Sequence, residues 1–197
     1  MCIRDRPEDT PGFARKIHVE ASRMIQLVND ILQLSHLDNV SETGAAPAME
    51  TVDLLDVARE CVERQKVNAR HSYISLTYLG ESAPVTGSRV LLDELCQNLC
   101  DNAIRYNRPG GKVQIITACT RDGHCTLTVK DNGIGIPKEA QTSVFERFYR
   151  VDKSRSKATG GTGLGLAIVK HIARIHNARI KLDSVVDEGC LLYTSPS

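Results

Sequence analysis

Residues 98–106 read Asn-Leu-Cys-Asp-Asn-Ala-Ile-Arg-Tyr, inside a helical pattern that runs from Ser88 to Tyr106. Asn98 and Asn102 are four residues apart, so both side-chain amides leave the same face of the helix. An amide oxygen is a hard, neutral ligand that suits Mg²⁺, which takes the rest of its shell from water and substrate phosphates. Taken alone, two asparagines at this spacing are ordinary solvated helix surface, so the pair needs support from elsewhere in the chain.

Three further segments offer that support, although each alone has an ordinary explanation as a turn or a solvated basic loop. They are Asp131-Asn-Gly133-Ile-Gly135, Phe145-Glu-Arg-Phe148-Tyr-Arg150 followed by Lys153, Arg155 and Lys157, and Gly161-Thr162-Gly163-Leu164-Gly165-Leu166. A carboxylate at a strand end can accept a hydrogen bond from an exocyclic amine, and glycines let a flat base approach the backbone. The cations of the second segment can reach phosphates. A glycine-rich loop that opens a helix forms an anion site from free N–H groups and the positive end of the helix dipole.

The glycine-rich segment also invites two other nucleotide-binding interpretations, and its context excludes both. A Rossmann fold places its glycines directly after a strand and an acidic residue about 20 residues further on. Here the polar stretch 146–162 precedes the glycines, and no strand with an acidic end follows at that distance. The phosphate-binding pattern GxxxxGK[ST] does not occur.

Residues 13–39 form the longest helical pattern of the chain, with an apolar seam along one side. The seam consists of Ile17, Ala21, Met24, Val28, Ile31 and Ser35, widened by Ile25 and Leu32. Steps of three and four residues place these side chains on one face. One helix cannot bury such a face by itself, so we expect a hairpin partner or a second subunit.

The remaining pattern predicts an α+β fold, a two-layer sandwich whose mixed sheet is covered on one face by helices. Strands are expected at 51–54, 73–79, 112–120, 125–131 and 180–186, and helices at 55–69, 88–106, 137–145 and 164–177. The small-residue stretch 41–48 indicates a linker between this domain and the preceding long helix. Residues 146–162 are too long for a simple connection and indicate a lid.

The composition excludes several classes of partner. The formal net charge is +1, so no basic excess attracts a nucleic acid or an acidic membrane. Aromatic residues make up only 4%, which disfavours stacking on single strands. No apolar run approaches the roughly 20 residues of a membrane span. The seven cysteines form no CxxC pair and no zinc spacing, so we expect reduced thiols, with Cys96 and Cys100 packed on one helix face.

Both ends of the chain break the patterns beside them. Residues 1–6 and 190–197 resemble translated sequencing-adapter sequence, so we expect both to be non-native. This interpretation divides the chain into a helical part (7–40), a linker (41–50) and a domain (51–189). It also predicts that the sheet lacks its final strand after Gly189.

Together, the four segments resemble the N, G1, F and G2 boxes of the ATP-binding catalytic domain of sensor histidine kinases, in family order and spacing. This domain shares a Bergerat-type fold with gyrase, the heat-shock chaperone and the MutL ATPases. The resemblance covers residues 51–189. Residues 13–38 resemble the second helix of the dimerisation and phosphotransfer hairpin, and their sequence is most similar to that of phosphate-responsive kinases.

The resemblance implies a role for each matching residue. Asn102 would coordinate Mg²⁺ with Asn98 beside it toward the phosphates of ATP, and Arg105 stands where the family usually has a phosphate-facing Lys. Asp131 would bind the adenine amino group, Gly133 and Gly135 would shape the base pocket, and Tyr106 would lie against the adenine. The triphosphate would be lined by Gly161, Thr162, Gly163, Leu164 and Gly165, with Lys153 and Arg155 reaching it from the lid.

The implied activity is transfer of the ATP γ-phosphoryl group to a histidine, for relay to the receiver domain of a response regulator. The family's phosphoacceptor motif, His-Glu-x-x-x-Pro, is absent here, and His18 and His36 read as surface or interface residues. Relatives that hydrolyse ATP carry a catalytic Glu at the position of Asn98. The alternatives are a nucleotide-gated interaction module without transfer, and an anti-sigma-factor serine kinase.

The resemblance also implies partners and a location. The missing hairpin helix and a second subunit would complete a homodimer. The chain would be the cytoplasmic domain of a parent that is anchored in the bacterial inner membrane through upstream segments.

Overall fold

A computed structural model describes residues 10–43, 47–151 and 161–195. Its elements are α1 (Thr10–Thr43), β1 (Glu50–Asp53), α2 (Leu54–His71), β2 (Ser75–Gly80), β3 (Pro84–Gly87), α3 (Arg89–Arg105), β4 (Lys112–Cys119), β5 (Cys125–Asp131), η2 (Lys138–Ala140), η3 (Ser143–Phe145), α5 (Gly165–Ile175), β6 (Arg179–Val185) and β7 (Gly189–Ser195). None of the helices in these ranges combines the length and the apolar character that a membrane span requires.

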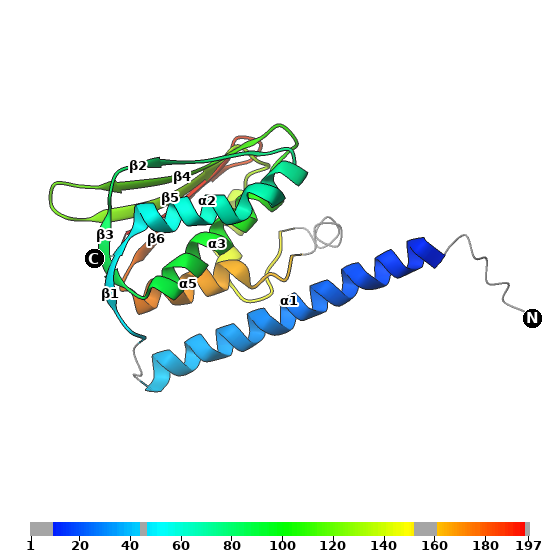
Figure 1. The fold of residues 1–197 in the computed structure, drawn as a ribbon, viewed down its shortest axis with the longest axis horizontal. Helices are drawn as coiled ribbons and strands as arrows, with labels where there is room; N and C mark the ends of the chain where they lie inside the picture. Colours follow the sequence, from blue (N-terminus) through cyan, green and yellow to red (C-terminus); the bar gives the residue numbers. More distant parts are fainter. Residues whose placement is uncertain (1–9, 44–46, 152–160, 196–197) are drawn as a thin grey trace, which may run out of the picture.

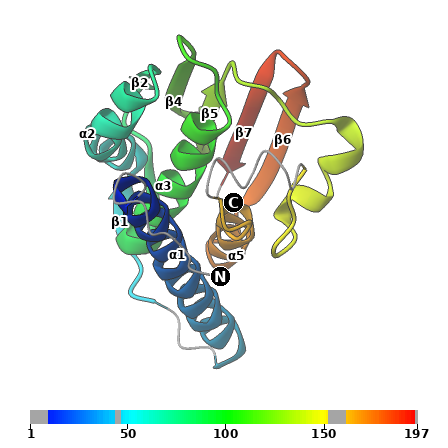
Figure 2. The same cartoon turned by 90° about the vertical axis from the view of Figure 1, so that its right-hand side faces the viewer.

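The predicted two-layer architecture is confirmed. Five strands form a mixed sheet in the order β2-β4-β5-β7-β6, in which only β2 and β4 run parallel. Helices α2, α3 and α5 cover one face, and α1 crosses beneath them (Figures 1 and 2). Alternate residues of β4 point into the helical layer, where Val113, Ile115 and Thr117 are buried. Period-two alternation therefore sets which face of the sheet builds the core.

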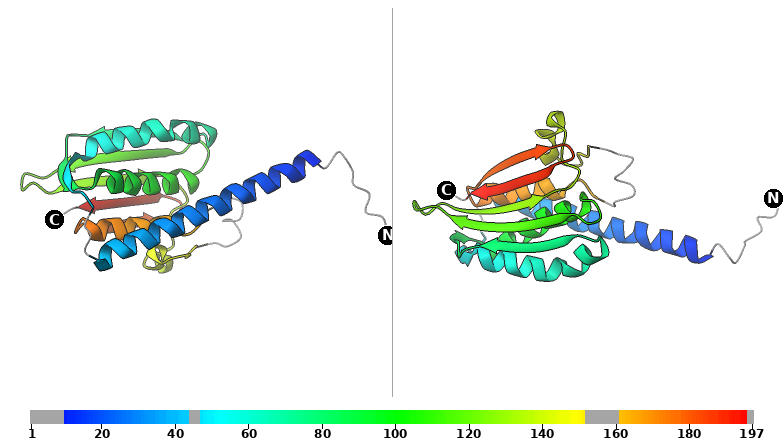
Figure 3. Two further views of the ribbon diagram at one scale, coloured as in Figure 1. Left: turned by 60° about the horizontal axis from the view of Figure 1, so that its bottom comes forward. Right: turned by 90° about the horizontal axis from the view of Figure 1, so that it is seen from above.

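The expectation that the sheet lacks its last strand is wrong. Residues Gly189–Ser195 form β7, which lies between β5 and β6 and pairs antiparallel with both (Figure 3). A tight connection with Asp187 at φ +67° and Gly189 at φ +109° turns β6 back into β7. Buried Leu192 then adds to the core. Whether these residues are native stays a prediction, but they complete the sheet.

Two other expectations need correction. Residues 137–145 do not form one helix but two short 3₁₀ turns, η2 and η3, the first of which begins after Pro137. Cys119 and Cys125, expected as free thiols, lie directly opposite each other at the turn end of the β4–β5 hairpin and form a disulfide. The prediction for Cys96 and Cys100 is confirmed, since both are fully buried in the core.

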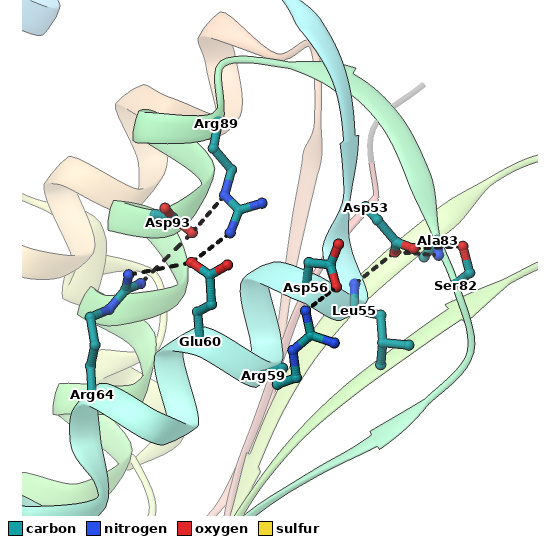
Figure 4. Close-up of polar contacts among 10 residues, drawn as sticks. All are labelled: Asp53, Leu55, Asp56, Arg59, Glu60, Arg64, Ser82, Ala83, Arg89 and Asp93. Carbon is teal, nitrogen blue, oxygen red and sulfur yellow. Dashed lines mark hydrogen bonds and ion pairs between the residues drawn. The ribbon is translucent and has the colours of Figure 1, made fainter.

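Polar contacts fix the start of α2 and its packing against α3 (Figure 4). Asp53 caps α2 by accepting from the backbone N–H of Leu55, and the same carboxylate accepts from Ser82 and from the N–H of Ala83. One residue thus joins β1, α2 and the start of β3. Between the helices, Arg89 and Arg64 of α3 and α2 bridge Glu60 and Asp93 at 2.7–3.8 Å.

Helix α1 has two apolar faces, and only one of them meets the domain. Leu34 and Leu37 are buried, and Leu27 packs against the same core. The seam predicted from the sequence points away, with exposed fractions between 44% and 64% for Ile17, Met24, Ile25, Val28, Ile31 and Leu32. The N-terminal part of α1 extends well past the domain (Figure 1). Within the part of the chain that the structure describes, this seam is left exposed to solvent.

Charged groups hold the docked face of α1. One Nη atom of Arg147, in the Phe145–Arg150 segment, donates to both carboxylate oxygens of Asp38 at 2.8 and 2.9 Å. The Nε2 atom of His171 lies 3.5 Å from the same carboxylate. Burial lowers the pKa of His171, although Asp38 opposes that effect. The C-terminal part of α1 is thereby fastened to α5 and to the segment before it.

Glu94 of α3 lies under α1, where its surroundings disfavour the ionised carboxylate. One of its carboxylate oxygens is buried without a hydrogen-bond partner among the described residues. Burial, followed by the nearby negative charge of Asp30, raises the pKa of Glu94 to about 7, although a hydrogen bond with Gln33 of α1 works against both. Near neutral pH the folded chain therefore holds a carboxyl group that resists ionisation.

We expect Glu94→Gln to stabilise the chain at pH 8 and to leave its stability nearly unchanged at pH 4. Because the pKa of Glu94 is raised in the folded state, ionising this buried carboxyl group destabilises the fold. This destabilisation is absent below the ordinary pKa of 4.5 and is complete only above about 7. The gain at pH 8 should be about 1–2 kcal/mol in the free energy of unfolding. Urea unfolding at both pH values measures it. Glu63→Gln, at an exposed position of α2, is the control, and an equal gain at both pH values would contradict the assignment.

Candidate functional site

The two predicted asparagines face the start of α5. On α3, Leu95, Cys96 and Leu99 point into the core, while Asn98 and Asn102 lie half-buried on another side. The Oδ1 atom of Asn98 lies 2.9 Å from the position that a Cβ atom on Gly165 would occupy, and Nδ2 of Asn102 lies 3.6 Å from it. The two amides and the beginning of the next helix thus share one small volume, as their spacing predicted.

The glycine-rich loop packs closely against the end of α3 and against the segment that contains Phe148. A Cβ atom at Gly161 would lie 3.0 Å from the guanidinium of Arg105 and 3.2 Å from the hydroxyl of Tyr106. Gly163 has φ +76°, and its Cβ would meet the backbone of Phe148 at 3.1 Å. The carbonyl of Gly163 accepts from the N–H of Phe148 at 2.9 Å. Glycine is favoured at 163 because the positive φ strains any other residue and a Cβ atom would press on the neighbouring backbone.

Asp131 marks the opposite end of the site, where β5 stops. Its Oδ1 atom accepts from the N–H of Gly133 at 2.8 Å. Burial raises the pKa of Asp131, while hydrogen bonds from the backbone of Gly133 and Cys190 lower it. The β7 strand, which the sequence analysis did not expect, thus supplies a donor to this carboxylate.

The glycines after Asp131 bring three elements together. The N–H of Ile134 donates to the carbonyl of Tyr106 at 3.1 Å, which joins the end of α3 to this turn. A Cβ atom at Gly133 would lie 2.4 Å from that same carbonyl. Gly135 has φ +67° and would place a Cβ atom 2.1 Å from the carbonyl of Val185 in β6. Tyr106 therefore connects the Asp131 end with the loop at Gly161.

The structure brings together nearly all of the predicted site residues. Asn98, Asn102, Arg105 and Tyr106 come from α3, Asp131, Gly133 and Gly135 from the end of β5, and Gly161, Thr162, Gly163, Leu164 and Gly165 from the start of α5. Lys153 and Arg155 lie outside the described residues. These residues are spread over positions 98 to 165 of the sequence, so only the fold could unite them.

One contact of the loop was not foreseen. The hydroxyl of Thr162 donates to Oδ2 of Asp30 in α1 at 2.6 Å, and the N–H of Leu164 reaches the Thr162 oxygen at 3.3 Å. Asp30 is 7% exposed and also accepts from Gln26 at 2.7 Å. No pattern in the sequence links position 30 with position 162, because the contact depends on how α1 docks.

The donor set fits a magnesium–phosphate ligand better than a protein-only metal centre. Among the described residues, no group of three or more His, Cys, Asp or Glu side chains is placed to hold a metal ion. Asn98 and Asn102 supply neutral amide oxygens, and Mg²⁺ completes such a shell with water and phosphate oxygens. Of two hollows of about 470 Å³, one lies beside η3 and α5 and the other between the ends of α2 and α3, where Arg105 lines it; neither includes Asp131 or the glycine-rich loop.

The histidines do not add a nucleophile to this cluster. His18 and His36 are exposed on α1, in agreement with their interpretation as surface residues. His176 is buried, where its Nε2 atom accepts from the N–H of Ser88 at 3.0 Å and Nδ1 lies 2.8 Å from the carbonyl of Ile172. This histidine has a structural role at the junction of β3, α3 and α5.

Comparison with known proteins agrees with this geometry. Residues 87–195 match the family model described as histidine kinase-, DNA gyrase B- and HSP90-like ATPase. The chain is 44% identical over 194 residues to the sensor-like histidine kinase SenX3 of Mycolicibacterium smegmatis, covering 96% of this chain and 48% of SenX3. It is 36% identical over 187 residues to the sensor protein kinase WalK of Staphylococcus saprophyticus, covering 94% of this chain and 30% of WalK.

A solved structure extends the likeness to the fold. The mycobacterial sensor histidine kinase MprB superposes with a TM-score of 0.65 at 31% identity, over 76% of this chain and 97% of the MprB chain. The present chain spans about half the length of SenX3 and under a third of WalK. It belongs to the histidine kinase-, DNA gyrase B- and HSP90-like ATPase family, in the branch of the sensor histidine kinases.

Proposed function

We propose that this chain is the ATP-binding catalytic part of a sensor histidine kinase. In the complete protein, the γ-phosphoryl group of ATP passes to a ring nitrogen of a histidine on a separate helix, and then to an aspartate of a response regulator. The observation that carries the proposal is the convergence of the paired amides, the strand-end carboxylate and the glycine-rich loop at one place.

Each part of the cluster suits one part of the nucleotide. The half-buried carboxylate of Asp131 would accept a hydrogen bond from the adenine amine, and Tyr106 would lie against the ring. The loop from Gly161 to Gly165 would surround the phosphates at the N-terminus of α5, where free N–H groups favour an anion. Asn102, with Asn98 beside it, would hold Mg²⁺, which neutralises phosphate charge when bound. Arg105 adds a fixed positive charge beside the loop.

The exposed seam of α1 supports the proposed partners. An apolar face this long on a helix that already packs elsewhere requires a second helical surface. We propose that it receives the phosphoacceptor helix of the hairpin and, through it, a second subunit. Residues 7–40 would then be the hairpin helix, 41–50 the linker and 51–189 the catalytic domain, extended by β7. Upstream segments would carry the sensor and the membrane anchor of the parent.

One alternative keeps support from a specific contact. The hydrogen bond between Thr162 and Asp30 couples the loop to α1, as a nucleotide-gated interaction module without phosphoryl transfer also requires. An anti-sigma-factor serine kinase is less well supported, because that branch normally lacks a hairpin helix such as α1.

The nucleotide assignment predicts how two substitutions affect binding. Asn102→Ala should weaken the affinity for ATP at least about tenfold in the presence of Mg²⁺, and much less in EDTA. Asp131→Asn should weaken ATP binding by a similar factor and reduce the preference for ATP over inosine triphosphate, which lacks the amine. Isothermal titration calorimetry measures both effects.

The matched control is Asp122→Ala, which removes an exposed carboxylate from the β4–β5 turn, far from the cluster. Thermal unfolding shows whether each variant is folded. No measurable ATP binding by a folded wild-type chain would end the proposal. If the control and the site variants lost ATP affinity equally, the nucleotide site would have to lie elsewhere in the chain.

Phosphoryl transfer is tested by supplying the missing helix in trans. We expect the chain, mixed with a separately produced hairpin that carries a phosphoacceptor histidine, to label it from [γ-³²P]ATP with an acid-labile bond. Asn102→Ala should abolish the label. Tight ATP binding without transfer would favour the interaction module, and an acid-stable label on serine would favour the anti-sigma branch.

A further inference from the structure

Asp30 reaches the phosphate-binding loop from a different part of the chain. It lies in the C-terminal half of α1, 132 positions before Thr162, and is 7% exposed. Its Oδ1 atom accepts from Gln26 at 2.7 Å, and its Oδ2 atom accepts the Thr162 hydroxyl at 2.6 Å. A buried carboxylate in two hydrogen bonds has a well-defined position.

The contact occupies donors that the loop would otherwise offer to an anion. A threonine hydroxyl has one proton, and here Asp30 holds it. The Thr162 oxygen in turn takes the N–H of Leu164, the residue that precedes α5. A phosphate and the Asp30 carboxylate are both anions that accept such donors near the positive end of a helix dipole. They therefore compete for the same loop.

Charge around Asp30 strengthens the competition. Burial is the main reason that the pKa of Glu94 in α3 is raised, and the nearby charge of Asp30 raises it further. Gln33 of α1 is hydrogen-bonded to Glu94. The docked helix thus adds negative charge next to a site that must receive a triphosphate. Two like charges in a partly buried place repel strongly because little water screens them.

We propose that Asp30 controls the phosphate end of the nucleotide site through Thr162, so that docking of α1 and binding of a triphosphate oppose each other. This inference rests on the proposed ATP site. When a triphosphate takes the loop, the Thr162 hydroxyl turns from Asp30 to a phosphate oxygen, and α1 loses its contact with the loop. By linkage, whatever moves α1 away from the domain also tightens triphosphate binding.

The first test compares three ligands on the full chain. Asp30→Ala should raise the affinity for a non-hydrolysable ATP analogue with Mg²⁺ at least about fivefold, raise that for ADP less, and leave that for adenosine unchanged. A residue with only a structural role would weaken all three. Asp30→Asn keeps the shape of the side chain and removes its charge. Its affinities should rise less than those of Asp30→Ala, again most for the ATP analogue, less for ADP and not for adenosine. This variant also keeps the test open if the alanine variant unfolds.

Glu20→Ala is the matched control, because it removes the same charge from an exposed position on α1, where Glu20 pairs with Arg23. It should leave all three affinities unchanged. Asp38→Ala breaks the ion pair with Arg147, distant from the loop contact, and should also raise triphosphate affinity if docking itself is the opposing state.

Hydrogen exchange supplies the reciprocal measurement. Adding the ATP analogue to the wild-type chain should accelerate amide exchange in residues 27–38 of α1, and adenosine should not. Equal or weaker triphosphate binding by folded Asp30 variants, with the wild-type chain binding, overturns this inference and leaves the proposed function intact. Failure of the wild-type chain and of both Asp30 variants to bind any nucleotide instead overturns the proposed function, and this inference with it.

Discussion

The site depends on a loop that has almost no room for side chains. Gly161 lies against Arg105, Gly163 against the backbone of Phe148, and Gly165 against the amides of α3. A Cβ atom at Gly163 would press on the backbone of Phe148 at 3.1 Å and would be strained at φ +76°. This close approach helps to fix where α5, the residues after η3 and the paired amides lie relative to one another. The geometry of the candidate site is thus set in large part by backbone fit.

The opposite end of the site depends on the sheet. Asp131 is held by N–H groups from Gly133 and from Cys190, the second residue of β7. These bonds favour the ionised carboxylate, while burial disfavours it. A strand that enters the sheet between β5 and β6 therefore affects a side chain at the rim of the site. The last residues of the chain are part of the site's construction, whatever their origin.

Helix α1 serves two surfaces at once. Its Leu34–Leu37 face is buried against α5, and the Ile17–Leu32 seam stays exposed. Asp30 and Asp38, on the docked side, contact Thr162 in the glycine-rich loop and Arg147 in the Phe145–Arg150 segment. A helix that touches the loop and offers a free apolar seam is physically able to connect nucleotide binding with assembly, since moving it changes both surfaces.

The sequence by itself determined the α+β class and most of the helices and strands, because periodicity and turn chemistry are local signals. The candidate site residues came from the order and spacing of four motifs that resemble a known family, since each motif alone has an ordinary structural explanation. Asn98 and Asn102 share a helix face for geometric reasons that no tertiary contact alters. Only the tertiary structure decided that residues 189–195 become a central strand, that Cys119 meets Cys125, and that Asp30 binds Thr162. Those outcomes join segments far apart in the chain or depend on strand register, and local patterns contain no information about which distant surfaces will be buried together.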